Sequence, residues 1–446
     1  MSKILIKNGL IVNENAVYES DIFIKNGKIE LVQSGIQKFA DYTINAAGKL
    51  VIPGIIDDQV HFREPGSVYK GSVFTESRAA VYGGVTSFMD MPNNNPSITT
   101  QEALQSKYDI ARTKSAANYS FYMGASNDNI DEILRTNNEN VCGIKIFMGS
   151  STGNLLVDDT RVLENIFSQS SSLIATHCED EDSVKANESL YFDKYGDDIA
   201  AVYHPKIRND ELCYMSSALA VDLAKKHNSR LHVLHLTTAK EMHLFDNKVK
   251  LEDKRITAEV CVHHLYFDDS DYLEKGNLIK CNPAIKSKDD NLALWAALLN
   301  DKLDVIATDH APHTWEEKSK KYKYAPSGLP LVQHSLVTML DFYHRDMISL
   351  EKIVDKMCHS PAKTFKIKER GYIREGYWAD LVILDMDKEW TVEKDNIYYK
   401  CKWSPFEGHR FKGLVEQVII NGELALEFGK LRNTKAAKRL LFDKDR

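Results

Sequence analysis

The chain has 446 residues, enough for a large barrel with a smaller domain beside it. Its 43% hydrophobic and 27% charged residues are ordinary for a soluble globular protein. The net charge of −7 is spread over the whole length without a basic block, which argues against nucleic acid as a partner. The N-terminus lacks a signal-peptide core and no apolar run approaches the ~18 residues that cross a bilayer, which argues against a membrane.

The cysteines indicate the redox compartment. There are seven, scattered along the chain, odd in number and without CxxC spacing. This usage favours reduced thiols over a disulfide framework or a thiolate zinc site. We therefore expect a cytoplasmic protein.

The two ends of the chain have the same β-rich pattern. Residues 1–52 consist of short alternating apolar runs, with Asn-Gly turn signals at 8–9 and 26–27. Residues 362–446 return to this style in GYIREGYWADLVILD and VEQVIINGELALEFGK. We predict that the two ends pair in space as halves of one small β-sandwich domain. The last 14 residues, NTKAAKRLLFDKDR, are expected to form a basic, solvated tail.

The segment between them, residues 53–361, alternates short apolar strands with helical stretches. Such repetition over about 300 residues favours an α/β fold with a parallel sheet, most economically an eight-stranded TIM-type barrel. A doubly wound open sheet is the competing architecture. No GxGxxG or GxxxxGK[ST] follows any strand, which weakens that alternative.

Polar residues stand where the predicted barrel strands end. Gln59, His61 and Arg63 are two apart, so one strand aims all three side chains at the same face. A lone histidine at a strand end is usually structural, and a lysine within an apolar strand is costly to bury. Reacting groups of such barrels gather at the C-terminal ends of the strands, however, so several such residues together indicate an active site. Later strand ends contribute Lys145, His177, His235, Asp309 and His313.

These residue types point to a metal. Imidazoles with a carboxylate are ligands for zinc, and zinc with an open position generates hydroxide near neutral pH. A protonated lysine would be repelled by such a cation. A neutral Lys145 can instead react with carbon dioxide, and the resulting carbamate is an anion that can bridge two metals.

Together these motifs resemble the amidohydrolase superfamily and, within it, the dihydroorotases. The resemblance covers nearly the whole chain. NGLIV and EGYWADLVILD are shared with hydantoinases and allantoinases, whereas HFREPG, MPNNNP and TDHAPH look much more like dihydroorotases. Between them lie PGIIDDQV, GIKIFMG, HCED, LHLTT and CNPAIKS.

The resemblance implies a role for each matching residue. Zinc, as one or two ions, would be held by His61, an N-carboxylated Lys145, His177, His235 and Asp309. Asp309 would also be the general base. The substrate would be held by Arg63, Asn93, Asn282 and His313, and by the backbone of a loop at Ser327 and Gly328.

The implied activity is the reversible cyclisation of N-carbamoyl-L-aspartate to L-dihydroorotate in pyrimidine biosynthesis. A guanidinium at Arg63 suits the carboxylate of that small-molecule substrate. Two alternatives stay open: an allantoinase or dihydropyrimidinase, and a non-catalytic relative that binds aspartate transcarbamoylase. The resemblance also leaves homo-oligomerisation open.

One position departs from the family pattern. The family has D-x-H-x-H where this chain has Asp57-Asp58-Gln59-Val60-His61, so an amide replaces the first histidine. An amide oxygen binds zinc far more weakly than imidazole does. Three outcomes follow: a two-metal site with Gln59 as a weak ligand or onlooker, a one-metal enzyme, or an inactive relative.

Overall fold

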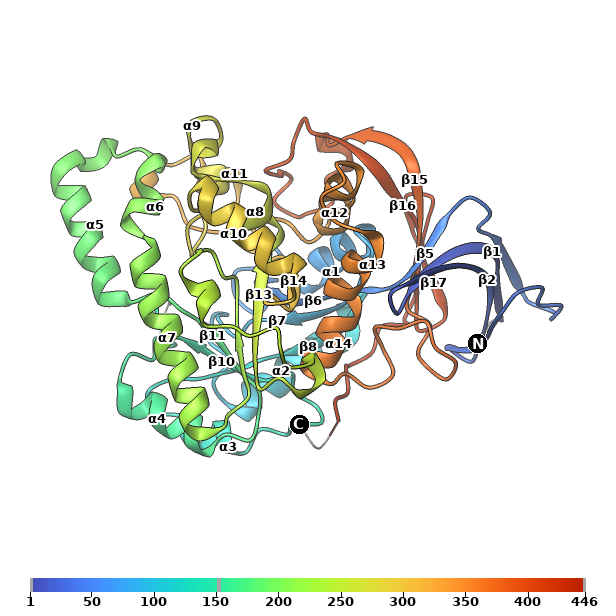
Figure 1. Ribbon diagram of the computed structural model, residues 1–446, viewed down its shortest axis with the longest axis horizontal. Coiled ribbons are helices and arrows are strands. Elements are labelled where there is room, and N and C mark those ends of the chain that lie inside the picture. Colours follow the sequence, from blue (N-terminus) through green and yellow to red (C-terminus); the bar gives the residue numbers. More distant parts are fainter. Residues whose placement is uncertain (1–2, 151–153, 444–446) are drawn as a thin grey trace.

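The computed structural model describes residues 3–150 and 154–443. A body of strands and helices stands beside a separate sheet, which holds the N-terminus (Figure 1). The body contains the parallel strands, and the separate sheet combines the two ends of the chain.

The parallel strands follow one another in chain order as a three-stranded and a six-stranded sheet. The first and last of these strands, β6 and β14, meet at their C-terminal ends. There the backbone of Val60 pairs with that of His310, and the His61 amide donates to the His310 carbonyl at 2.7 Å. This confirms the predicted α/β barrel, with β8 and β9 sharing one of its eight positions. The strands are β6 (Ile55–Val60), β7 (Val85–Asp90), β8 (Asn118–Phe121), β9 (Met123–Gly124), β10 (Ile144–Phe147), β11 (Ile174–His177), β12 (Leu231–Val233), β13 (Ile256–Cys261) and β14 (Val305–Ala307).

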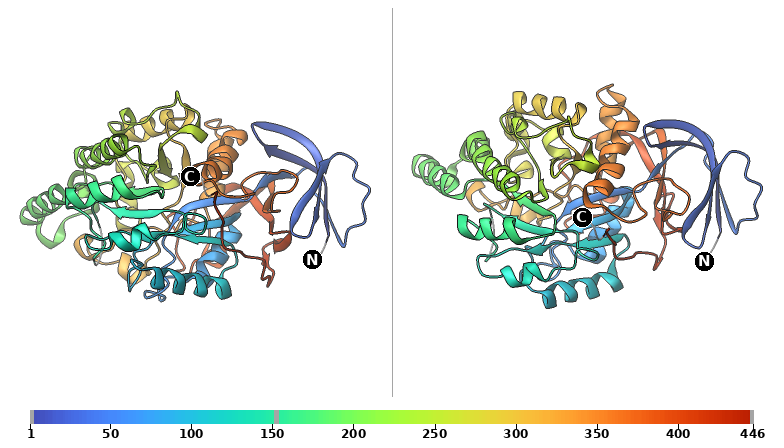
Figure 2. Two further views of the ribbon diagram at one scale, coloured as in Figure 1. Left: turned by 90° about the horizontal axis from the view of Figure 1, so that it is seen from below. Right: turned by 60° about the horizontal axis from the view of Figure 1, so that its bottom comes forward.

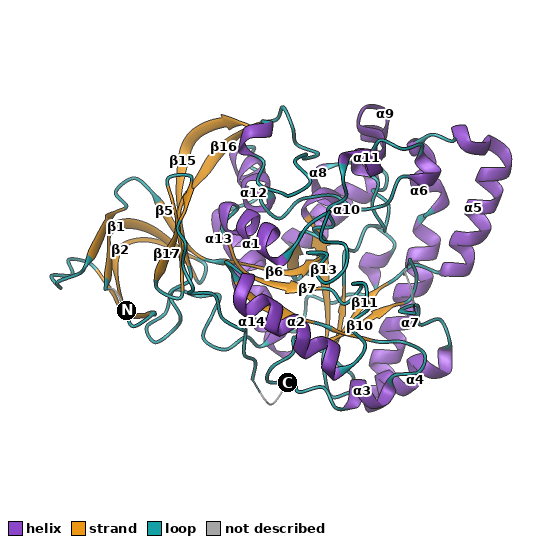
Figure 3. Cartoon of the chain, turned by 180° about the vertical axis from the view of Figure 1, so that it is seen from behind, coloured by secondary structure: helices purple, strands orange, loops and turns teal. Residues whose placement is uncertain are grey.

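Helices surround these strands (Figure 3). They are α1 (Val73–Tyr82), α2 (Gln101–Lys114), α3 (Ile130–Leu134), α4 (Thr160–Gln169), α5 (Glu181–Tyr195), α6 (His204–Ile207), α7 (Asp210–His227), α8 (Val262–Tyr266), α9 (Tyr272–Lys275), α10 (Lys288–Leu299), α11 (Trp315–Lys318), α12 (Ser335–His344), α13 (Leu350–Val354) and α14 (Ser360–Phe365). In the described part of the chain, no helix has the length and apolar character needed to cross a membrane.

Helix α7 illustrates how the sequence sets these elements. Its buried residues recur at three- and four-residue spacing, which places one apolar face against the strands. The Asn209 side chain accepts a hydrogen bond from the Leu212 amide and caps the first turn. Asn228 ends the helix in the left-handed conformation, with φ of 53°.

The separate sheet has nine strands from both chain ends, in the order β18-β17-β16-β15-β5-β1-β2-β3, with β4 also pairing with β1. Ile24 of β2 and Ile419 of β16 belong to one buried cluster although their strands are far apart in the sheet, so the sheet folds over a shared core. The strands are β1 (Ile4–Asn13), β2 (Ala16–Lys25), β3 (Lys28–Gln33), β4 (Tyr42–Asn45), β5 (Leu50–Pro53), β15 (Leu381–Thr391), β16 (Arg410–Ile420), β17 (Glu423–Glu427) and β18 (Lys430–Leu431).

The chain passes from this sheet into the barrel at Gly54, between β5 and β6. A Cβ at Gly54 would lie 2.1 Å from the Thr86 hydroxyl oxygen, so only glycine fits here. The predicted domain boundaries at residues 52 and 361 stay predictions, and the second falls inside helix α14.

The C-terminal tail differs from the prediction of a solvated end. Leu440 and Phe442 are fully buried, and the Leu440 amide donates to the Tyr119 carbonyl beside β8. The C-terminus accordingly lies against the barrel, away from the N-terminus (Figure 2). Apolar residues between the basic ones gain more from burial here than the segment loses in freedom.

Candidate active site

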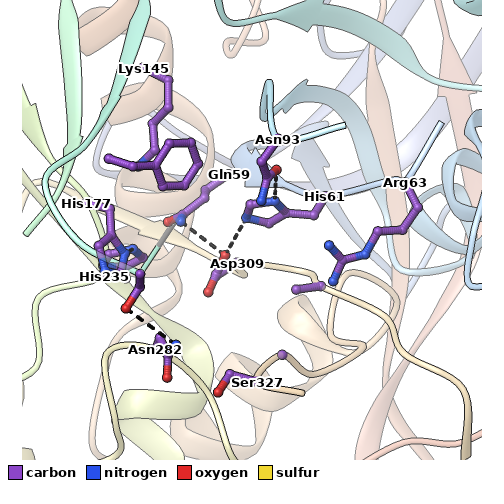
Figure 4. Close-up of a pocket in the computed structure, with 14 residues that line it drawn as sticks. Gln59, His61, Arg63, Asn93, Lys145, His177, His235, Asn282, Asp309 and Ser327 are labelled. Atoms are coloured by element: carbon purple, nitrogen blue, oxygen red, sulfur yellow. Dashed lines mark hydrogen bonds and ion pairs between the residues drawn. The ribbon is translucent and has the colours of Figure 1, made fainter. Parts of the chain in front are cut away.

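A pocket with about 500 Å³ of empty space opens at the C-terminal ends of the barrel strands (Figure 4). It brings together all the predicted site residues except His313, which lies directly beside it. Its lining is Gln59, His61, Arg63, Asn93, Lys145, Phe147, Ser150, His177, His235, Asn282, Asp309, Ala311, Ser327 and Gly328.

Three of the predicted residues have an unusual backbone. Arg63, His235 and Asp309 have φ of 67°, 38° and 49°, in the left-handed region that side-chain-bearing residues rarely adopt. Each follows a barrel strand, so the chain turns sharply as it leaves the sheet. Strain of this kind is held in place by the surrounding structure and is common at functional sites.

Asp309 is held through one of its two carboxylate oxygens. Its Oδ1 lies 2.9 Å from His61 Nε2 and accepts a hydrogen bond from Gln59 Nε2 at 3.1 Å. Nδ1 of His61 in turn lies 2.7 Å from Asn93 Oδ1. Burial acts to raise the pKa of Asp309, but the hydrogen bond and charge of His61 outweigh it and the pKa is lowered. Asp309 is therefore an ionised carboxylate whose Oδ2 is left for other partners.

Gln59 has a defined orientation at the floor of the pocket. Its amide nitrogen faces Asp309, and its Oε1 lies 3.9 Å from the Cys261 sulfur. The side chain is buried, so these two neighbours fix which end of the amide faces which way.

His177 and His235 lie side by side in the pocket, with their rings in contact. His177 Nδ1 lies 2.9 Å from His235 Nε2, while His177 Nε2 donates to Glu179 at 2.9 Å. That bond leaves the lone pair of His177 on Nδ1, toward the pocket, which is the arrangement a metal-binding histidine needs. Burial lowers the pKa of both imidazoles, so both are neutral and able to donate a lone pair.

Lys145 is buried on β10 with its ammonium group in the pocket. Within residues 3–150 and 154–443, its Nζ has no hydrogen-bond partner and lies 4.5 Å from the centre of the Phe147 ring. Burial lowers the pKa of Lys145 to about 7, so a large fraction is the neutral amine at neutral pH. The orphaned amine beside two neutral imidazoles and a carboxylate fits a zinc centre with a carbamylated lysine.

The opposite end of the pocket is positively charged. Arg63 donates through Nε to the Pro312 carbonyl at 3.1 Å, and its Nη2 lies 3.0 Å from His313 Nε2. Lys70 Nζ lies 3.0 Å from His313 Nδ1 and 3.0 Å from a Glu317 oxygen. Lys70 and Arg63 can only donate, so they act on the His313 tautomer in opposite directions. Lys70 favours the proton on Nε2, which lies 3.0 Å from the Ser327 carbonyl, whereas Arg63 favours it on Nδ1, which lies 3.4 Å from Glu317.

Sequence reasoning missed several residues around the site. Glu179 follows His177 by two positions, so the alternation that singled out Arg63 after His61 could have indicated it. Its Oε2 also accepts from Arg208 at 2.7 Å, which supports a negative charge on Glu179. No sequence signal pointed to Lys70, because it reaches His313 from a loop 243 residues away in the chain.

A second missed group lies beneath the pocket, inside the barrel. His232 Nε2 lies 3.1 Å from Asp58 and 3.6 Å from Glu259, and all three side chains are fully buried. Burial acts to lower the pKa of His232, but the two carboxylates raise it to about 9. Glu259 also accepts a hydrogen bond from the strained His235 amide at 2.9 Å, which connects this cluster to the site.

Comparison with known proteins agrees with this fold. The Amidohydrolase family matches residues 210–425, and the Dihydro-orotase-like family matches residues 48–239. The chain is 32% identical to a dihydroorotase from Pyrococcus furiosus over 442 residues, covering 98% of this chain and 96% of the relative. It is also 29% identical over 445 residues to an allantoinase from Desulfitobacterium hafniense, covering 98% of each.

Solved structures lead to the same class. An L-hydantoinase (dihydropyrimidinase) from Arthrobacter aurescens superposes with a TM-score of 0.93 at 26% identity, covering 99% of this chain and 100% of that one. The chain belongs to the amidohydrolase family. Within that family it is a metal-dependent cyclic amidohydrolase of the dihydroorotase-like group.

Proposed function

We propose that this chain is a zinc-dependent dihydroorotase, which interconverts L-dihydroorotate and N-carbamoyl-L-aspartate. The observation that carries this proposal is the positive end of the pocket. Arg63 lies half-buried there beside His313 and Lys70, facing a site whose opposite end holds the proposed metal ligands. A half-buried guanidinium pairs favourably with an anion, and the carboxylate of dihydroorotate supplies one.

The proposed zinc ligands are His61, Lys145, His177, His235 and Asp309, with Lys145 carboxylated by addition of carbon dioxide to its amine and loss of one proton. When bound, zinc would act as a Lewis acid on the ring carbonyl and activate water. Whether one or two ions bind depends on Gln59. Its amide donates to Asp309, which supports a single strong metal position at His177 and His235.

Proton transfer is assigned to Asp309. Gln59 donates to its Oδ1, so Oδ2 accepts the proton of the attacking water and then returns it to the departing ring nitrogen. Ring closure uses the same atom in the reverse order.

The remaining polar residues orient the ring. Asn93 Oδ1 is engaged by His61, which leaves the Asn93 amide hydrogens for a ring carbonyl. Asn282 Oδ1 is buried without a hydrogen-bond partner in the described residues, so it is free to accept from a ring N–H. The His313 side chain and the backbone at Ser327 and Gly328 close the carboxylate end.

The substitution Arg63→Ala tests the substrate assignment. We expect KM for dihydroorotate to rise about 100-fold, because a charge-assisted bidentate contact is lost. Arg63→Lys is the control, since it keeps the charge without the paired geometry and should recover part of the affinity. An unchanged KM for dihydroorotate in Arg63→Ala would remove this role.

The same experiments distinguish this proposal from two other functions. An allantoinase or dihydropyrimidinase acts on an uncharged ring, for which Arg63 has no partner. A non-catalytic protein that binds aspartate transcarbamoylase would hold less than ~0.2 equivalents of zinc even after addition of zinc and bicarbonate. Association with that enzyme, homo-oligomerisation and a cytoplasmic location stay predictions.

A further inference from the structure

A second group of metal-binding side chains lies at the end of β13, outside the proposed catalytic ligands. It consists of Cys261, the last residue of the strand, and of His263 and His264 in the first turn of α8. One ligand atom from each lies within 4.8 Å of the other two. The exposed fractions of these residues are 0%, 0% and 3%. We call this group the β13 cluster.

Three of the four imidazole nitrogens in the β13 cluster have no hydrogen-bond partner among the described residues. In the described part of the chain, neither ring nitrogen of His263 has a hydrogen-bond partner, and neither does Nδ1 of His264. Burying a polar atom without a partner costs roughly 1–3 kcal/mol, so an imidazole with both nitrogens unpaired needs an explanation. A bound ligand at the β13 cluster would supply one.

His264 is already oriented for coordination. Its Nε2–H donates to the Pro283 carbonyl at 3.2 Å, which leaves the lone pair on Nδ1. The backbone around it is fixed because Asn291 donates to the carbonyls of both His264 and Leu265 at 2.9 Å. A histidine whose second nitrogen is tied to a carbonyl is the usual arrangement at metal sites.

We propose that Cys261, His263 and His264 form a further zinc site, distinct from the catalytic ligands. A thiolate with two imidazoles is a donor set typical of zinc. Ligands around a tetrahedral ion with bonds of about 2.0–2.3 Å are separated by roughly 3.3–3.8 Å. The ligand atoms of the cluster lie within 4.8 Å of one another, so they need to approach by at most about 1.0–1.5 Å.

Binding replaces the thiol proton of Cys261 with the metal. The Cys261 sulfur lies 3.4 Å from Glu259 Oε1, so this buried carboxylate takes up the thiol proton. Two electrons of the sulfur form the bond to zinc, and no redox partner is needed.

The β13 cluster also gives Gln59 a second neighbour. The Gln59 amide oxygen lies 3.9 Å from the Cys261 sulfur, while its nitrogen faces Asp309 and the pocket. Gln59 therefore lies between the pocket and the cluster, and its oxygen is a candidate for a weak fourth ligand beside the nearer carboxylate of Glu259. The proposal is independent of which ring the enzyme opens.

Cobalt substitution separates this site from the catalytic one. The proposed catalytic ligands contain no sulfur, so a thiolate-to-cobalt charge-transfer band in the near ultraviolet reports only a cysteine ligand. We expect this band when the metal-depleted full chain is titrated with Co²⁺. It should disappear in Cys261→Ser and weaken in His264→Gln, and zinc content should fall by about one equivalent in Cys261→Ser.

Two matched variants serve as controls. Cys401→Ser lies away from the cluster, and Cys178→Ser follows the proposed catalytic ligand His177, so both should retain the band. Absence of the band in the wild-type protein overturns the proposal, and this result does not depend on any variant folding. A band that survives Cys261→Ser, or one that Cys178→Ser removes, also overturns it. If a buried water, and not a metal, supplies the hydrogen bonds of the imidazoles, the wild-type protein shows no charge-transfer band.

Discussion

The two oxygens of the Asp309 carboxylate have different surroundings and different proposed roles. Its Oδ1 is held by His61 and Gln59, and its Oδ2 is left to carry a proton. Asp309→Asn removes the base but keeps the shape of the side chain. We expect turnover to fall about 10³-fold or more in both directions while the thermal melting curve stays close to wild type. Activity within tenfold of wild type would show that Asp309 does not carry the proton.

We propose that Lys70 acts on the substrate through His313. Lys70 beside Nδ1 favours the Nε2–H tautomer and Arg63 beside Nε2 favours the Nδ1–H tautomer, so loss of Lys70 shifts the proton away from Nε2 and from the proposed substrate carboxylate. We expect Lys70→Met to raise KM for dihydroorotate about tenfold with little change in kcat, and Lys70→Arg to restore most of the loss.

The tautomer of His313 gives a readout that does not depend on activity. The ¹⁵N shifts of His313 should show a larger fraction of the Nδ1–H form in Lys70→Met than in the wild type. Lys206→Met, at an exposed position, is the control. Identical shifts in wild type and Lys70→Met would contradict a positioning role for Lys70.

Residues at strand ends were predictable from sequence because a strand aims alternate side chains at one face. This rule predicted that four residues would approach one another, and all four line the pocket: His61, Arg63, His177 and Asp309. It could not supply their supporting contacts. Lys70 reaches His313 from a loop, and its position depends on how distant segments pack.

At the scale of the elements, the strands β6, β12 and β13 are joined inside the barrel by Asp58, His232 and Glu259. Replacing the cation leaves two buried carboxylates facing each other. We expect His232→Phe to lower the free energy of unfolding by about 3–5 kcal/mol in urea titrations. His243→Phe, at an exposed position, is the matched control. A loss below about 1 kcal/mol would mean that the cluster is not an ion pair.

The β13 strand shows where local sequence patterns stop being informative. The sequence contains no CxxC spacing, so it did not indicate a thiolate metal site. In the structure, however, Cys261 lies close to His263 and His264. Their approach depends on the helical first turn of α8 directly after the strand. Periodicity alone did not place a helix start at that residue.

At the scale of the whole molecule, the change from alternating runs to strand–helix repeats predicted both the barrel and the pairing of the chain ends. The pairing order did not follow from the sequence. Strand β1 pairs with β2, β4 and β5, and β5 then pairs with β15 more than 300 residues later. Such register depends on the shared core, as does the burial of Leu440 and Phe442 against the barrel.

The site as a whole combines a positive end with a proposed metal end, an arrangement that suits the small anionic ring of the proposed substrate. The most direct test is to compare kcat/KM of the zinc-loaded, full-length protein for L-dihydroorotate, allantoin and dihydrouracil, with the metal content measured on the same sample. We expect dihydroorotate to be preferred by about 100-fold or more, because only this substrate pairs with Arg63. Equal or better turnover of allantoin or dihydrouracil by the metal-loaded protein would contradict the proposed function.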